Sequence, residues 1–231
     1  MEHTSEEAQE EKRPSLRDEF NSHITTLAAS ILPFIQSIPP LALWGGLMTV
    51  PLITYFAIML TSPNQFFEAL IQLFFEHFLI ELVVAIIGFI ILIYSIIFMR
   101  FNKKECLIKT GPYSLVRHPQ YLGVILFITT ISCRSYWILT HTFGIGWLQS
   151  EGTVVLWLFT LVAYIVLAKI EESHLMNKFG EDYNDYRRSV GFIIPYTSTD
   201  NKWIEIFISI LIPVVIFIAL LTSANLLFTI W

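Results

Sequence analysis

Long apolar runs alternate along the chain with shorter stretches in which the charged residues gather. A helix that crosses a bilayer needs about 20 mostly apolar residues, and uncharged runs of this kind are typical of membrane helices. We predict five such helices, at residues 41–60, 82–99, 119–133, 152–168 and 206–231. The pattern therefore predicts an all-α fold, a polytopic bundle of about five transmembrane helices.

The charged residues between these runs indicate the topology. Two stretches, 100–118 and 169–202, hold most of the lysines and arginines. A predicted helical hairpin separates them, and Arg134 with the region of residues 144–146 indicates its turn. Because short basic loops stay on the cytoplasmic side of a membrane, we place both stretches on the cytoplasmic face, together with the N-terminus. The loop at 100–118 and short helices at 171–195 are then expected to form a cytosolic pocket.

The chain divides into two parts of different composition. Residues 1–23 are rich in glutamate and lack an apolar run, so we predict an exposed N-terminal tail and not a signal peptide. Residues 24–231 are predicted to form a single transmembrane domain, in which the last helix, 203–231, carries no motif.

Composition supports the membrane interpretation and excludes some partners. Of all residues 55% are hydrophobic and 14% are charged, whereas soluble domains carry about a quarter charged residues. The net charge of −5 gives no reason to expect nucleic acid. The spacing of Cys106 and Cys133 gives no reason to expect a metal site.

The first stretch that could form a functional site is residues 109–123. Gly111 and Pro112 predict a turn, and His118-Pro119 is predicted to open a helix, because proline suits the first helical position. Free N–H groups at a helix start favour an anionic ligand group. The polar and aromatic side chains around this start are Tyr113, Arg117, His118 and Tyr121. The alternative is a belt of interfacial anchors, in which tyrosine, arginine and histidine are also common.

The second stretch is residues 169–195. Glu171 and Glu172 follow directly from a predicted span, a costly position for two carboxylates without a partner or a role. Gly180 is predicted to end this helix, and a short amphipathic helix follows. Its apolar face is formed by Tyr183, Tyr186 and Val190. The alternative to a functional site is an interfacial helix pair that only packs on the bundle. For Glu171 we favour a functional role.

Together, the two stretches resemble the isoprenylcysteine carboxyl methyltransferase family and the related phospholipid N-methyltransferases. The shared pattern is Gly-Pro-Tyr, then Arg-His-Pro-x-Tyr-x-Gly, and, after a helical hairpin, Glu-Glu-x-x-Leu, Phe-Gly-x-x-Tyr-x-x-Tyr and a proline. In this chain it is carried by Gly111, Pro112, Tyr113, Arg117, His118, Pro119, Tyr121, Gly123, Glu171, Glu172, Leu175, Phe179, Gly180, Tyr183, Tyr186 and Pro195. The resemblance covers a core of about residues 105–195.

The resemblance implies an enzyme that uses S-adenosylmethionine as methyl donor, held in the cytosolic pocket. The implied cofactor-binding residues are Glu105, Cys106, Leu107, Ile108, Tyr113, His118, Pro119, Gln120, Tyr121, Glu171 and Glu172. The donor carboxylate suits the helix start and His118, while its amine and sulfonium suit Glu171 and tyrosine rings. We further expect Arg117 and Glu171 to be catalytic, and Arg117 and Lys169 to bind the substrate.

The methyl acceptor implied by the resemblance is a lipid-like or prenylated molecule within the membrane, first of all the carboxylate of a C-terminal prenylcysteine. Leu167, however, occupies the position where eukaryotic members carry an arginine that meets this carboxylate. A phospholipid or another amphiphile therefore stays open as acceptor. Two other classes also stay open: an NADPH-dependent membrane reductase of the sterol-reductase type, and a transporter or scaffold, which predicts ionisable residues inside the spans.

Overall fold

The computed structural model describes residues 46–61, 79–102, 107–141, 149–199 and 201–229. They belong to one compact unit within Pro39–Trp231. The predicted N-terminal tail, residues 1–23, lies outside the described residues, as do the first residues of the predicted transmembrane domain.

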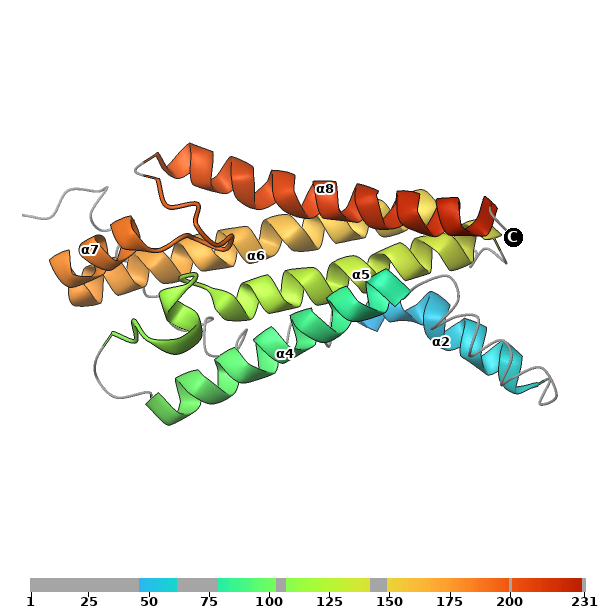
Figure 1. Cartoon of the computed structure of the whole chain (residues 1–231), viewed down its shortest axis with the longest axis horizontal. Coiled ribbons are helices and arrows are strands. Elements are labelled where there is room, and N and C mark those ends of the chain that lie inside the picture. Colours follow the sequence, from blue (N-terminus) through green and yellow to red (C-terminus); the bar gives the residue numbers. More distant parts are fainter. Residues whose placement is uncertain (1–45, 62–78, 103–106, 142–148, 200, 230–231) are drawn as a thin grey trace, which may run out of the picture. The chain divides into compact units, whose positions relative to one another are not determined.

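The described residues are almost entirely helical and contain no β-strand (Figure 1). In chain order the elements are α2 (Gly46–Leu60), α4 (Leu79–Asn102), the short 3₁₀ helix η3 (Gly111–Ser114), α5 (Pro119–His141), α6 (Ser150–Phe179), α7 (Glu181–Ser189) and α8 (Lys202–Thr229). By length and composition, four described segments can cross a membrane: Leu79–Asn102, Pro119–His141, Ser150–Phe179 and Lys202–Ser223. The predicted all-α transmembrane bundle is confirmed.

The first predicted span, residues 41–60, is described only from Gly46 onward. The 15 residues of α2 correspond to about 22 Å at about 1.5 Å per residue, which is shorter than the hydrocarbon core of about 30 Å. Residues 41–45, which would lengthen this helix, lie outside the described residues.

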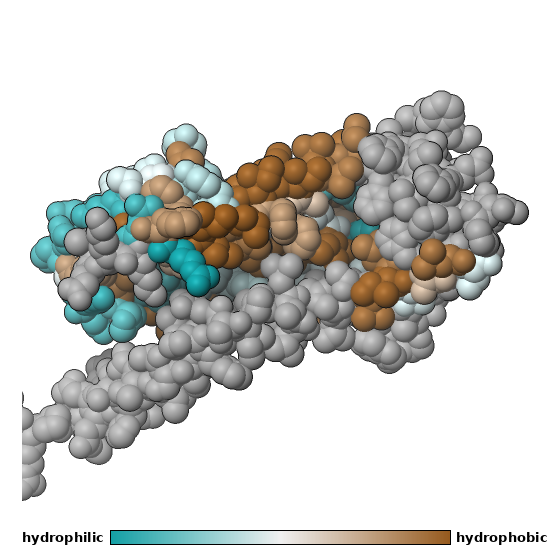
Figure 2. Space-filling model, turned by 90° about the horizontal axis from the view of Figure 1, so that it is seen from below, coloured by the Kyte–Doolittle hydropathy of each residue, from teal (hydrophilic) through white to brown (hydrophobic). Residues whose placement is uncertain are grey.

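The outward faces of the long helices carry large apolar side chains. Those exposed on α4, α6 and α8 include Ile86, Ile90, Val155, Phe159, Val166, Phe207, Leu211, Val215 and Ile218. Figure 2 shows hydrophobic residues over much of the face drawn and hydrophilic residues gathered toward one end. So large an apolar surface suits lipid and not water, in agreement with the spanning segments.

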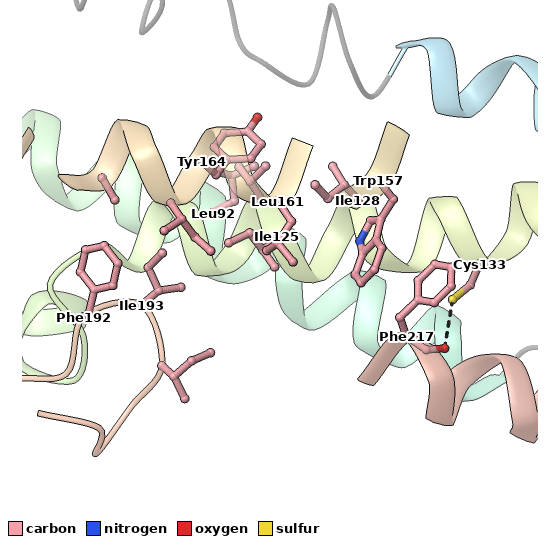
Figure 3. Close-up of a cluster of buried hydrophobic side chains, with 14 of the residues drawn as sticks. Leu92, Ile125, Ile128, Cys133, Trp157, Leu161, Tyr164, Phe192, Ile193 and Phe217 are labelled. Carbon is pink, nitrogen blue, oxygen red and sulfur yellow. Dashed lines mark hydrogen bonds between the residues drawn. The ribbon is translucent and has the colours of Figure 1, made fainter. Parts of the chain in front are cut away.

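Helix α5 is the central helix of the bundle. It contacts α2, α4, α6 and α8. Of the apolar segment with which it can span a membrane, 61% is buried, whereas 17% of the corresponding segment of α4 is buried. In the core, the Trp157 Nε1 donates a hydrogen bond to Thr129 Oγ1 at 3.0 Å, and the Trp157 ring stacks on Phe217 with 4.3 Å between centroids. The Cys133 thiol donates to the Phe217 carbonyl at 3.7 Å (Figure 3). Cys133 is therefore an ordinary core residue.

Helices α4 and α5 approach each other most closely at two glycines. A Cβ atom on Gly123 would lie 2.6 Å from the backbone nitrogen of Leu92, and one on Gly88 would lie 2.9 Å from the Gly123 carbonyl oxygen. Small residues at such crossings let helix backbones pack closely in a membrane. Gly123, near the start of α5, therefore allows close contact with α4.

We expect Gly123→Ala to lower the thermal stability of the detergent-purified protein, because the added methyl group meets the backbone of α4. Overpacking of this kind costs about 1–3 kcal/mol. Val155→Ile is the matched control, since it also adds one carbon but on an exposed face of α6. Equal melting temperatures for the two variants, measured by differential scanning fluorimetry, would contradict this account of the α4–α5 crossing.

The turn of the hairpin was predicted at Arg134 and the region of residues 144–146. The assignment of Arg134 to this turn is wrong, whereas residues 144–146 lie outside the described residues. Helix α5 continues to His141, and the buried Arg134 side chain extends to α4, where its Nη2 lies 3.0 Å from Glu81 Oε2. Charged side chains inside a membrane are tolerated when they pair with each other. The sequence did not predict this pair, which links α4 to α5. The described parts of the spans are otherwise nearly free of charged residues.

The prediction of short helices over 171–195 needs correction. Residues 171–179 continue α6, which is 30 residues long, and α7 alone is a separate short helix in this stretch, of nine residues. Gly180 separates the two helices with a φ of +52°, a conformation that L residues rarely adopt. The carboxylates of Glu171 and Glu172 are therefore held on the extended, rigid end of a spanning helix.

Candidate functional site

The two motif-bearing stretches meet through their backbones. An isolated parallel bridge joins Val116 to Gly191, the Arg117 N–H donates to the Gly191 carbonyl at 2.8 Å, and the His118 N–H donates to the Phe192 carbonyl at 3.2 Å. A Cβ on Gly191 would lie 2.3 Å from the Ile194 carbonyl oxygen, so glycine is required for this turn. These contacts fix the residues before α5 against the segment that follows α7.

Four charged side chains from three parts of the chain form a closed arrangement, which we call the ion-pair ring. Arg117 binds Glu172 through Nη1 and Glu205 through Nη2. The Lys169 Nζ lies 2.9 Å from Glu172 Oε2 and 2.9 Å from Glu205 Oε2. The side chains of Arg117 and Glu205 are completely buried. Two cations and two anions thus alternate, which compensates their removal from water.

The ion-pair ring bears on three predicted site residues. Arg117 and Lys169 direct their charged groups to Glu172 and Glu205. Glu172 also accepts a hydrogen bond from the Tyr183 hydroxyl at 3.2 Å. The ring gives all three a structural role, and their predicted substrate or cofactor contacts stay predictions.

The sequence did not single out Glu205. It lies in the first turn of α8, a helix without a motif, and 88 residues separate it from its partner Arg117. The available signal was a carboxylate at the start of a long uncharged run, which is a costly position unless a partner is present. Its burial places α8 in direct contact with the motif-bearing core.

His118 lies directly before α5 and is almost fully buried. Its Nδ1 is 3.4 Å from Glu171 Oε2, its Nε2 is 3.8 Å from Glu172 Oε1, and its ring meets Phe192 edge-on with 5.3 Å between centroids. Burial lowers the pKa of His118, but the interactions with the Glu171 and Glu172 carboxylates outweigh it, so the pKa is raised above its ordinary value.

Several buried polar atoms of His118 and of residues linked to it have no hydrogen-bond partner among the described residues. They are Nδ1 and Nε2 of His118, Oε2 of Glu171 and the hydroxyl of Tyr164. The Tyr121 ring lies between them, 5.5 Å from the His118 ring and 5.7 Å from the Tyr164 ring. We call these atoms the unsatisfied cluster. Since buried polar groups nearly always form hydrogen bonds in native proteins, a polar ligand bound here would supply the missing hydrogen bonds.

Tyr113 closes another side of the same region. Its hydroxyl donates to Gln120 Oε1 at 3.3 Å, and its carbonyl accepts a bond from the Tyr186 hydroxyl at 2.6 Å. Burial, with the negative charge of Glu171, raises the pKa of Tyr113 above its ordinary value. Glu171 acts electrostatically on both Tyr113 and Tyr121. Its charge therefore acts on one imidazole and two phenol groups.

The remaining predicted cofactor contacts are spread around this region. Pro119 is the first residue of α5 and is buried. Leu107 packs against the cluster of Tyr183, Tyr186 and Val190, and Ile108 is half-buried. Glu105 and Cys106 lie outside the described residues. The predicted packing of α7 through its tyrosines is confirmed.

The raised pKa of His118 predicts a pH-dependent contribution to stability. The folded protein binds this proton more tightly than the unfolded chain, so the stabilisation is complete below the ordinary histidine pKa of about 6.5 and is lost as the pH rises through the folded-state value. We expect the difference in melting temperature between wild type and His118→Gln to be largest in acid and to shrink as the pH rises. The exposed His174 provides the control variant, His174→Gln. A wild-type advantage that grows with pH would contradict the raised pKa.

Comparison with known proteins gives one distant relative. The chain is 26% identical over 83 residues to a methanethiol S-methyltransferase of Pseudomonas deceptionensis, a stretch that makes up 36% of this chain and 26% of that protein. The chain thus matches about a quarter of the length of this relative. No family model matches the chain, and no solved structure is significantly similar to it.

Proposed function

We propose that this chain is an integral-membrane methyltransferase that uses S-adenosylmethionine as methyl donor and an acceptor dissolved in the membrane. The observation that carries the proposal is the unsatisfied cluster around Glu171 and His118, at the polar ends of spanning helices. The resemblance of the two motifs to membrane methyltransferases supports the proposal, as does the relative that methylates a thiol.

The residues of the unsatisfied cluster fit the chemistry of this donor. S-adenosylmethionine carries a cationic sulfonium, an amine and a carboxylate. Glu171 provides a carboxylate for the amine, since its Oε2 faces His118 Nδ1 at 3.4 Å but makes no hydrogen bond among the described residues. The rings of Tyr113 and Tyr121 offer π-faces that attract a cationic sulfur. The imidazole of His118, with its raised pKa, suits the donor carboxylate.

When bound, the donor supplies a methyl group activated by its positive sulfur. The chain's own contribution is to hold the two reactants in line and to exclude water. The burial of His118 and Tyr113 removes solvent from this region, which strengthens each electrostatic contact made there. A carboxylate, thiolate or amine acceptor needs no general base, so the reaction requires positioning more than proton transfer.

The prenylcysteine carboxylate is one candidate acceptor, and its methylation would form an ester. This acceptor calls for a cation near the site. Leu167 packs in the apolar core, and Arg117 and Lys169 have their charges matched within the ion-pair ring. A carboxylate would therefore have to compete with Glu172 or Glu205 for its counter-charge.

A thiol is the second candidate acceptor, and two observations favour it. The relative at 26% identity is a thiol S-methyltransferase, and a thiol binds as a neutral group, so its binding makes no demand on the cations of the ion-pair ring. After the thiol has lost its proton to solvent, the thiolate would attack the methyl group, the bond from this methyl to the donor sulfur would break, and a thioether and S-adenosylhomocysteine would form. An apolar thiol would also dissolve in the bilayer next to the spanning helices.

A methyl-transfer assay tests the proposal and separates the acceptors. Purified protein in lipid nanodiscs is incubated with isotope-labelled S-adenosylmethionine and either a farnesylcysteine derivative or methanethiol, and products are identified by mass spectrometry. A labelled methyl ester supports the carboxylate, and a labelled thioether supports the thiol. Absence of any labelled product, also after addition of a membrane lipid extract, would contradict the proposed function.

A further inference from the structure

A polar cavity lies where α7 ends and the chain approaches α8. Its volume is about 290 Å³, and it is lined by Asn184, Arg187, Arg188 and Thr199. At about 30 Å³ for each water molecule, it holds a group about ten waters in size. None of the described residues that line it belongs to the unsatisfied cluster or to the motifs that the proposed donor site uses.

The groups that line this cavity are hydrogen-bond donors suited to an anion. Two guanidinium groups present planar, paired N–H groups that match phosphate oxygens, and Thr199 adds a hydroxyl. The Asn184 amide donates to Glu181 Oε2 at 3.3 Å and has a second N–H, so it adds a further donor. A tetrahedral phosphate matches this set better than a neutral ligand does.

The charge balance next to the cavity also favours an anion. The Nη2 of Arg187 lies 3.9 Å from Glu205 Oε2, but Arg117 and Lys169 already pair with that carboxylate. The two anions of the ion-pair ring are matched by its two cations. Arg187 therefore shares Glu205 with two closer cations, so the ring matches its charge only in part.

The residues next to the cavity indicate that it lies at the membrane surface. Thr199 precedes by three residues the start of α8 at Lys202. Near it, the side chains of Trp203 and Tyr196 are 78% and 92% exposed. Tryptophan and tyrosine concentrate at the headgroup level of membranes. A phosphate bound at this level would lie where lipid headgroups are found.

We propose that the cavity lined by Asn184, Arg187, Arg188 and Thr199 binds the phosphate of an anionic phospholipid headgroup. The lipid would tie the end of α7 to the membrane surface next to α8. The proposal does not depend on the methyltransferase function.

The test uses the full chain in detergent micelles. Its melting temperature is followed while dioctanoyl phosphatidylglycerol, dioctanoyl phosphatidylcholine or inorganic phosphate is titrated. We expect stabilisation by the anionic lipid, with half-saturation at about tenfold higher concentration in Arg187→Gln and Arg188→Gln, since each removes a charge-assisted hydrogen-bond donor. Lys178→Gln is the matched control, because it removes one exposed charge at the end of α6 and does not line the cavity.

Three outcomes would overturn the proposal. Phosphatidylcholine that stabilises as strongly as phosphatidylglycerol would exclude recognition of an anionic headgroup. Equal weakening in Lys178→Gln would indicate general charge attraction and no defined cavity site. Inorganic phosphate that is as effective as the lipid at equal concentration would assign the cavity to a soluble anion.

Discussion

Glu205→Ala is expected to destabilise the protein strongly, and more than Gly123→Ala does. The substitution leaves Arg117 and Lys169 with Glu172 as their remaining partner in the ion-pair ring, and the Arg117 side chain is completely buried. Removal of one member of a buried ion pair costs about 3–5 kcal/mol, because a charge then stays in a poorly solvated place. The expected result is a large drop in melting temperature and in the yield of folded protein from detergent.

Two further variants make this prediction specific to the ion-pair ring. Glu151→Gln removes an exposed carboxylate from the first turn of α6 and should leave the melting temperature unchanged. The double variant Lys169→Met/Glu205→Leu removes one cation and one anion and leaves the Arg117–Glu172 pair matched. It should be more stable than Glu205→Ala, since replacing a whole buried pair by apolar residues is often neutral. A Glu205→Ala protein as stable as Glu151→Gln would refute the structural role of the ring.

Glu171→Gln is expected to have the largest effect on donor binding. The change keeps the size of the side chain but removes the charge that we assign to the donor amine and sulfonium. A charge-assisted hydrogen bond contributes about 1.5–3 kcal/mol, so the affinity for S-adenosylhomocysteine or S-adenosylmethionine should fall about 10- to 100-fold. Isothermal titration calorimetry of the purified protein measures this change directly.

The expected loss must be separable from a loss of folding. The Glu171 side chain is 17% exposed and lies outside the ion-pair ring, so Glu171→Gln should lose only the stability that comes from its interaction with His118 and should stay folded under the conditions of the binding assay. Glu151→Gln, at the other end of the same helix, is the control for a lost carboxylate and should bind the donor normally. Unchanged affinity in Glu171→Gln would show that the donor site has been assigned to the wrong residues.

Some elements were predictable because their signal is local. The run of uncharged residues before Arg100 identified α4, and His118-Pro119 identified the start of α5, because proline fits the first helical position. Gly180 ended α6 as predicted, since its positive φ favours glycine. In each case the deciding residues are neighbours in the sequence.

The partners of charged residues were not predictable because they come from distant helices. Arg134 resembles a loop residue until Glu81, 53 residues earlier, is seen to face it. Arg117 and Glu205 are likewise 88 residues apart. A hydropathy pattern shows that a charge is costly, but it does not show which other helix supplies the counter-charge. The end of α6 at Gly180 was predictable, but the span was predicted as residues 152–168, and hydropathy did not show that the charged residues up to Phe179 belong to the same continuous helix.

Binding of the methyl donor tests the central claim most directly. The melting temperature of the purified chain is measured with S-adenosylmethionine, S-adenosylhomocysteine or NADPH, because a ligand that binds the folded state raises it. The account predicts stabilisation by both methionine-derived ligands, lost in Glu171→Gln, and none by NADPH. Stabilisation by NADPH without any by S-adenosylmethionine or S-adenosylhomocysteine would contradict it.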